Sequence, residues 1–361
     1  MRSLYVLLLF ALATTTIQAQ DVSIDEESVD LEALYQKIDE VISESPQYVA
    51  EREQHITVCR DSFLKAESPE QRFLKAEELF HLYQPYRNDS ALYYADLCIS
   101  LAESIHRPDL AGRFRSLLAL QCSNTGMEAE SLDQLRLVKR SALDNKSLVA
   151  YYNAWMHVCG ELASYTQRAT MRKDYFDKQN LYRDSVMMVA AEGSEEWLHL
   201  KMDILSAQRH FQGALATSYQ WLKSVKEGTH ERAYAAFYRS MVYEHLGNHD
   251  LACYWLGKSA LDDIRCAVMN QASLLFLAEH LANDGDISRA LRYMEFSKEC
   301  NTTFCPNLRA YQFSSVINVI EKSRVAALHR AKLIFIVAAA VIALLILLLV
   351  IVIVRLSKVK K

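Results

Sequence analysis

The sequence predicts an all-α fold in which a solenoid of helical hairpins is followed by one transmembrane helix. Three observations predict it. The 361 residues include nine Gly and five Pro, which is few turn formers for a chain rich in Leu, Ala and Glu. Ala214, Ala252 and Ala290 recur at intervals of 38 residues. A run of 22 apolar residues, 333–354, is long enough as a helix to cross a hydrocarbon core of about 30 Å.

Residues 1–19 have the pattern of a secretory signal peptide. Arg2 gives the positive start, residues 4–13 form a short apolar core, and cleavage is expected after Ala19. The alternative is an uncleaved N-terminal anchor. Residues 20–30 are expected to form an acidic linker, and residues 31–67 a helical lead-in.

Residues 68–307 are expected to form the helical repeats. Ser68, Pro69 and Gln71 have the pattern of a helix start, with a capping Ser, a Pro in the first turn and a Gln that closes a capping box. This helix is expected to run to about residue 82. Further helices are expected at 91–102, 110–122, 128–140, 148–165 and 171–191.

The second half carries the 38-residue period. Gly247 and Gly285 each stand five residues before the recurring Ala, where a Gly can end one helix in a left-handed conformation and a small Ala lets the next helix approach closely. These features resemble the tetratricopeptide repeat, whose usual period is about 34 residues. The matching positions are Ser240, Tyr243, Gly247 and Ala252 in one unit, and Ala278, Gly285, Asp286 and Ala290 in the next.

The resemblance implies a concave groove lined by the first helix of each hairpin. By that resemblance, Tyr234, Phe237 and Met241 are expected to face a protein or peptide partner. The alternative is that these side chains pack between hairpins. Tyr is a residue type that interfaces favour.

The C-terminal part is expected to comprise a juxtamembrane helix at 308–332, the transmembrane helix at 333–354 and a basic cytoplasmic tail at 355–361. Basic residues flank both sides of the span, so the signal peptide decides the orientation, with residues 20–332 in the periplasm. Ala339 and Ala343 place two small residues on one helix face, which makes homodimerisation through the span a hypothesis.

Four N-terminal segments, together with the signal, repeats and span, resemble one Bacteroidetes family of exported tetratricopeptide-repeat, single-span membrane proteins described as regulators. The segments lie at 34–41, 48–56, 68–72 and 88–95. Members of that family usually continue into a cytoplasmic region after the span. The sequence stops at Lys361 without it, as a shortened member or a truncated form would.

The eight Cys all lie in the part expected to be exported. Asn301 and Pro306 suggest a loop at 301–304, which makes a Cys300–Cys305 disulfide a candidate. His245 and His249 have a spacing found in metal sites, but Gly247 between them argues against a shared helix face. No metal site is therefore expected, and Asp284, Gly285 and Asp286 lack the further ligands of a calcium loop.

The sequence predicts a binding protein and not an enzyme, with no catalytic residues and no cofactor. A net charge of −4 and a pI of about 6.3 leave no basic footprint for nucleic acid. We expect a scaffold at the inner membrane that binds a protein or peptide in the periplasm and serves sensing or regulation. The alternatives are a structural adaptor of an envelope complex and a receptor for a glycan or small ligand.

Overall fold

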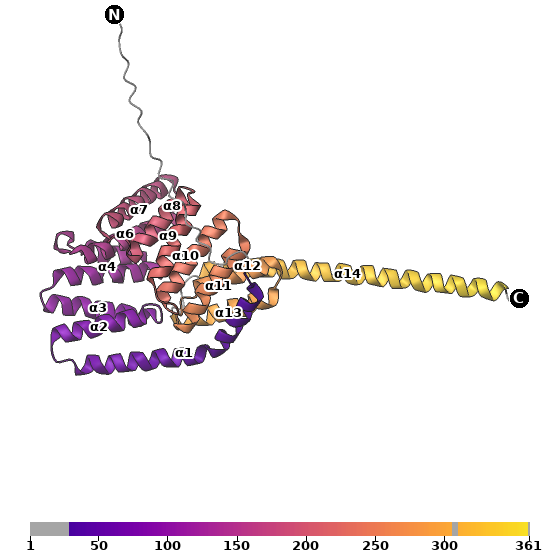
Figure 1. Cartoon of the computed structure of the whole chain (residues 1–361), viewed down its shortest axis with the longest axis horizontal. Coiled ribbons are helices and arrows are strands. Elements are labelled where there is room, and N and C mark those ends of the chain that lie inside the picture. The colour runs from indigo at the N-terminus through magenta and orange to yellow at the C-terminus, as the bar shows by residue number, and fades with distance from the viewer. Residues whose placement is uncertain (1–28, 305–309, 360–361) are drawn as a thin grey trace, which may run out of the picture.

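The fold is a curved stack of helical hairpins from which one long helix projects (Figure 1). The computed structural model describes residues 29–304 and 310–359, so the expected signal peptide and Cys305 lie outside the described residues. All regular structure in the described part is helical, which confirms the predicted fold class. The six hairpins of this part are α2 (Pro69–Tyr83) with α3 (Asn88–Ser104), α4 (Pro108–Asn124) with α5 (Glu128–Arg136), α6 (Asn145–Tyr165) with α7 (Ala169–Val189), α8 (Glu195–Ala207) with α9 (Phe211–Ser224), α10 (His230–Leu246) with α11 (His249–Arg265), and α12 (Ala272–Asp284) with α13 (Ile287–Phe304).

Local sequence signals account for the helix ends. The Ser68 hydroxyl accepts a hydrogen bond from the Gln71 N–H at 3.1 Å, so the predicted cap at the start of α2 is confirmed. The Gln71 side chain accepts from the N–H of Glu67, one residue before the position that a standard capping box uses. The first bond satisfies a donor that the first turn of a helix leaves without a partner, and the second holds the residue before the cap.

The 38-residue period is a structural repeat. The second helices α9, α11 and α13 begin at Phe211, His249 and Ile287, again 38 residues apart. Gly247 (φ 70°) and Gly285 (φ 95°) end the preceding helices in the left-handed conformation, as predicted. The equivalent position before α9 is Arg209, which adopts φ 59° without being a Gly.

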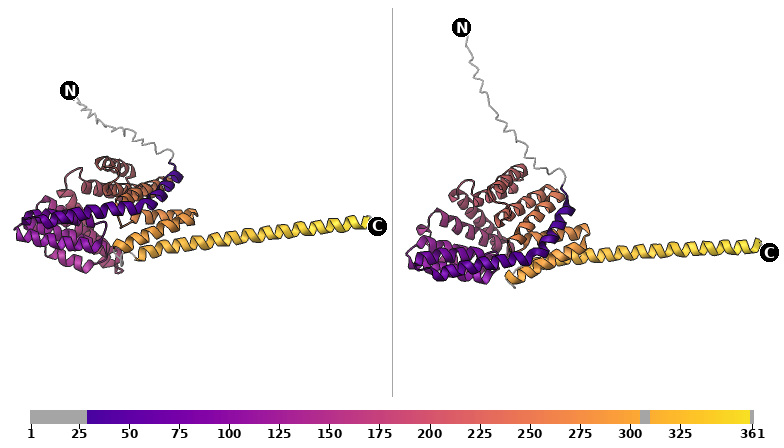
Figure 2. Two further views of the ribbon diagram at one scale, coloured as in Figure 1. Left: turned by 90° about the horizontal axis from the view of Figure 1, so that it is seen from below. Right: turned by 60° about the horizontal axis from the view of Figure 1, so that its bottom comes forward.

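The helix α1 (Leu31–Lys65) is the element expected as a lead-in, and it ties the two ends of the hairpin stack together. Figure 2 shows this long helix running along the stack from the last hairpins to the first. Its first half buries Leu34, Ile38 and Val41 in one hydrophobic cluster with α11, α12 and α13. Its second half buries Ile56 and Cys59 in another cluster with α2, α3 and α4.

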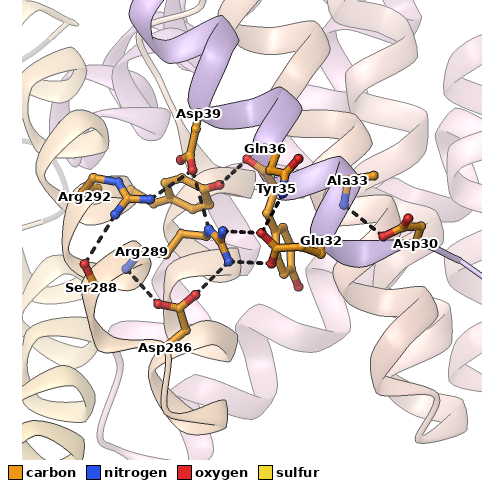
Figure 3. A network of polar contacts seen from close by, with 11 residues as sticks. Asp30, Glu32, Ala33, Tyr35, Gln36, Asp39, Asp286, Ser288, Arg289 and Arg292 are labelled. Carbon is orange, nitrogen blue, oxygen red and sulfur yellow. Dashed lines mark hydrogen bonds and ion pairs between the residues drawn. The ribbon is translucent and has the colours of Figure 1, made fainter.

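Polar contacts fix α1 near its start and again in its second half. Near its start, the Arg289 guanidinium of α13 contacts Glu32 at 2.9 Å and lies over the Tyr35 ring, while Arg292 contacts Asp39 at 3.0 Å (Figure 3). Further along, Arg52 donates hydrogen bonds to the backbone carbonyls of Cys266 and Leu82. Arg52 thereby bonds to a residue that lies 214 positions later in the sequence.

A glycine permits the close approach of α1 to α11. A Cβ atom at Gly257 would stand 2.6 Å from Cδ2 of Leu34 and 3.3 Å from Cδ1 of Ile38. Such distances are shorter than van der Waals contact, so a side chain at this position would push α1 away or force Leu34 into another rotamer. The lack of a side chain at residue 257 therefore allows α1 to pack closely against α11.

The helix α14 (Ala310–Val359) continues from the repeat body into the apolar run without a break (Figure 1). It packs against α12 and α13, and Ile320 is buried in the same cluster as Ile38 of α1. In the described part of the chain, one helical segment is long and apolar enough to cross a membrane, Ile317–Ile353, and an 18-residue stretch within it has a mean hydropathy of 3.6. The segment expected as a separate tail continues α14 through Val359.

The prediction of a loop at 301–304 was wrong, because these residues form the last turn of α13. The hydroxyls of Thr302 and Thr303 donate to carbonyls one turn earlier, so the helix accommodates both residues. Cys300 and Phe304 are buried in the cluster that contains α2 and α3, which favours continuing the helix. The pairing of Cys300 with Cys305 stays a prediction.

Replacing Ile38 with Ala should detach α1 from the last hairpins. Ile38 is fully buried, so the substitution should lower the free energy of unfolding by about 2–5 kcal/mol. Denaturation of the full chain in detergent, followed by circular dichroism, measures this loss, and limited trypsin digestion should show earlier cleavage at Lys37. Leu135→Ala, in a separate cluster, should cost a similar amount without exposing Lys37. Equal cleavage in both variants would contradict this role of α1.

Replacing Arg209 with Gly should stabilise the protein by about 1 kcal/mol, because it removes the cost of a left-handed conformation at an exposed residue. The matched control is Gly247→Ala, which should destabilise by a similar amount. Thermal unfolding of the two variants beside the parent chain measures both effects, and a lower melting temperature for Arg209→Gly would show that its side chain has a stabilising role.

Candidate functional site

The three residues predicted to face a partner lie together on the exposed side of α10. Tyr234 is 39% exposed and Met241 43% exposed, while Phe237 is half-buried between them. Phe276 of α12, 44% exposed, extends this surface, with its ring centroid 5.9 Å from that of Phe237. We call the surface formed by Tyr234, Phe237, Tyr238, Met241 and Phe276 the aromatic face. Sequence reasoning missed Phe276, although α12 is the next first helix of the repeat.

Edge-to-face and tilted ring contacts support the aromatic face from below. The Tyr238 ring centroid lies 4.0 Å from that of His199 on α8, and the hydroxyls of Tyr234 and Tyr238 lie 3.2 Å apart. Trp221 of α9 is fully buried beneath them, with ring centroids 5.8 and 6.0 Å from the two tyrosines. Edge-to-face and tilted ring pairs of this kind orient aromatic side chains, so Tyr234 and Tyr238 are fixed before any ligand binds.

Two carboxyl groups beside the aromatic face, those of Glu195 and Asp203, have raised pKa values. Desolvation, together with the nearby Glu196 and Glu231 carboxylates, raises the pKa of Glu195 to about 7. Desolvation also raises the pKa of Asp203 to about 6 and lowers that of His199 to about 4. His199 is therefore neutral at pH 7, with its Nε2 3.4 Å from Asp203 Oδ2. These groups give the end of the aromatic face near α8 both hydrogen-bond donors and acceptors.

The structure separates the two histidines that the sequence placed at metal-ligand spacing. The His245 ring lies against Phe211, with centroids 5.8 Å apart, while His249 lies beside His280 of α12, with centroids 5.2 Å apart. Gly247 ends the helix between them, which confirms the reason given against their pairing. The neighbours of His249 come from another helix and were not foreseen.

The pair Ala339 and Ala343 lies on the exposed part of α14. The two residues are one helical turn apart and outside the repeat body, among the apolar residues of the candidate span. Their role in self-association stays a prediction.

The comparisons with known proteins identify a repeat family. The model of the SusR N-terminal TPR domain matches residues 42–315. No curated protein matches the chain. Among solved structures, the TPR2AB-domain:pHSP90-complex of yeast Sti1 matches at 9% identity and a TM-score of 0.31, covering 79% of this chain and 98% of that chain.

Replacing Glu195 with Gln should change how stability depends on pH. In the folded protein Glu195 keeps its proton up to about pH 7, whereas the unfolded chain loses it near the ordinary value of 4.5. The parent chain should therefore lose stability as pH rises through this interval. Since Gln imitates the protonated carboxyl, Glu195→Gln should melt at a higher temperature than the parent at pH 7.5, and the difference should shrink toward pH 4.5.

Thermal unfolding across this pH series measures the effect, with Glu227→Gln as the control because Glu227 is highly exposed. Parallel pH profiles for the parent and Glu195→Gln would contradict the raised pKa.

Proposed function

The chain belongs to the family of the SusR N-terminal TPR domain, and from this premise we propose that it is a membrane-anchored repeat scaffold that binds a protein or peptide partner. The observation that carries the proposal is the aromatic face, a rigid and exposed apolar surface on the first helices of two neighbouring hairpins. Aromatic residues and Met are enriched in protein interfaces. Stacked hairpins offer such surfaces for recognition.

The proposed location is the inner membrane, with the repeats in the periplasm and α14 as the single span. The apolar segment Ile317–Ile353 supports the anchor, and the signal-peptide pattern of residues 1–19 supports the orientation. The packing supports a role in sensing or regulation, because the aromatic face extends onto α12 and α12 packs against α14. A partner that orders α12 would act on the helix that enters the membrane.

A second candidate function is a receptor for a glycan or another small ligand. The observation that favours it is the combination of two phenol hydroxyls, Tyr234 and Tyr238, with the carboxyl groups of Glu195 and Asp203 nearby. Against it, the two hollows that the described part of the structure shows are shallow and lie along α14, and neither is lined by a residue of the aromatic face. Small-molecule sites are usually concave and bury most of the ligand, so the aromatic face fits an extended segment better.

The proposal is tested with a photo-crosslinking amino acid placed at Met241 in cells. We expect it to form an adduct with a second protein, identified by mass spectrometry. The matched control is the same amino acid at Met188 of α7, which is 86% exposed but lies outside the aromatic face. An adduct from position 241 that is absent from position 188 supports a protein partner. No adduct from position 241, or the same adducts from both, would contradict it, and would favour the small-ligand candidate.

We further propose that α14 pairs with a second copy through Ala339 and Ala343. Replacing both with Ile should fill the close contact between helices and reduce association in the membrane by about 10-fold or more. Val341→Ile, on another face of the same helix, is the control. A membrane-association reporter measures the effect, and unchanged association of the Ala339→Ile, Ala343→Ile double variant would refute the pairing.

A further inference from the structure

Four side chains with metal-binding atoms converge where α11 meets α12. His249 and Cys253 stand one turn apart at the start of α11, and His280 and Asp284 stand one turn apart at the end of α12. The ligand atoms of His249, Cys253 and His280 all lie within 4.8 Å of one another. Cys253 Sγ and Asp284 Oδ2 lie 3.6 and 2.8 Å from the same atom, Nε2 of His249.

These distances are close to those of a tetrahedral site. Zinc binds histidine nitrogen at about 2.0–2.1 Å and cysteine sulfur at about 2.3 Å, so its ligand atoms stand about 3.3–3.8 Å apart. The observed separation of 3.6 Å between Cys253 sulfur and His249 nitrogen falls in this range. Asp284 Oδ2, at 2.8 Å from the same nitrogen, is closer than this range, so the Asp284 side chain must rotate away from His249 to become a ligand. His249 and Cys253 of α11 and His280 of α12 thus place three donors close together, and Asp284 of α12 lies beside His249.

The charge around Cys253 suits a cation. Burial is the main cause that raises the pKa of Cys253 to about 12, and the negative charges of Asp284, Glu244 and Asp250 contribute to the same rise. A divalent ion would offset this negative charge and favour loss of the thiol proton, since metal-bound cysteine is a thiolate. The Tyr35 hydroxyl of α1 donates a hydrogen bond to Cys253, and this bond stabilises the thiolate.

The surroundings provide both support and access. Glu244 Oε1 lies 3.0 Å from Nε2 of His280, and carboxylates of this kind orient histidines in metal sites. Cys253 is fully buried, whereas the side chains of His249 and Asp284 are 43% and 48% exposed. An ion can therefore reach the cluster from solvent.

We propose that His249, Cys253, His280 and Asp284 form a site for one zinc ion at the junction of α1, α11 and α12. The mixed nitrogen, sulfur and oxygen donors suit zinc better than the oxygen-seeking magnesium or calcium. The ion would fasten α11 to α12 directly beneath Tyr35 of α1. The alternative is that these residues form two ordinary ion pairs, His249 with Asp284 and His280 with Glu244.

The test uses the full chain in detergent, freed of metal with a chelator and kept reduced, and titrates it with Co²⁺ as a spectroscopic probe. We expect one equivalent to bind, with a thiolate-to-cobalt charge-transfer band and the intense visible bands of tetrahedral cobalt. Addition of Zn²⁺ should abolish both. Absence of these bands, or binding without thiolate character, would overturn the proposal.

Variants distinguish this site from the other cysteines and histidines. Cys253→Ser should remove the charge-transfer band, and His249→Gln should weaken Co²⁺ binding by at least about 10-fold. Because His249 is partly exposed, its variant should fold even where the Cys253 variant does not, and circular dichroism checks both. His245→Gln and Cys98→Ser are the controls. Loss of the bands in either control, or their retention in His249→Gln, would place the metal elsewhere and refute the site.

Discussion

The packing of α1 against the last three helices of the stack is the interaction on which the rest of the structure depends. A hairpin stack is held together between neighbours, so its two ends are usually independent. Here Leu34 and Ile38 join a hydrophobic cluster that also holds residues of α11, α12, α13 and α14. At the same contact, Arg289 donates charged hydrogen bonds to the carboxylates of Glu32 and Asp286 (Figure 3). The first helix is thereby part of the base from which α14 projects.

This arrangement connects the aromatic face with α14 through a short path. Phe276 lies on the exposed side of α12, while Leu274 and Leu277 of the same helix are buried in the cluster that contains Ile320 of α14. A helix that presents a binding surface on one side and packs against α14 on the other can transmit a change in its position. If α12 has two positions, the free energy with which a ligand shifts α14 cannot exceed the difference between the free energies with which the ligand binds the two positions.

The sequence alone was sufficient for most helices because their signals are local. Ser68, Gly247 and Gly285 act within one turn, and the structure has each at the predicted helix end. The loop at 301–304 was wrong because burial of Phe304 outweighed two threonines and a nearby Pro. Contacts between α1 and α13 join residues more than 250 positions apart, and no local pattern indicates them. The partners of His249 on α12 were missed for the same reason. The i and i+4 pairs themselves, His249 with Cys253 and His280 with Asp284, can be read from the sequence.

The central claim is that α1, the last hairpins and the start of α14 form one cooperative unit. Hydrogen exchange of the full chain in lipid nanodiscs, followed by mass spectrometry, tests it most directly. Peptides from the first half of α1, from α12 and from residues 317–332 should exchange together, with one common free energy of opening. If α1 exchanged well before α12 while the latter stayed protected, the first helix would be a loose attachment and the account would be wrong.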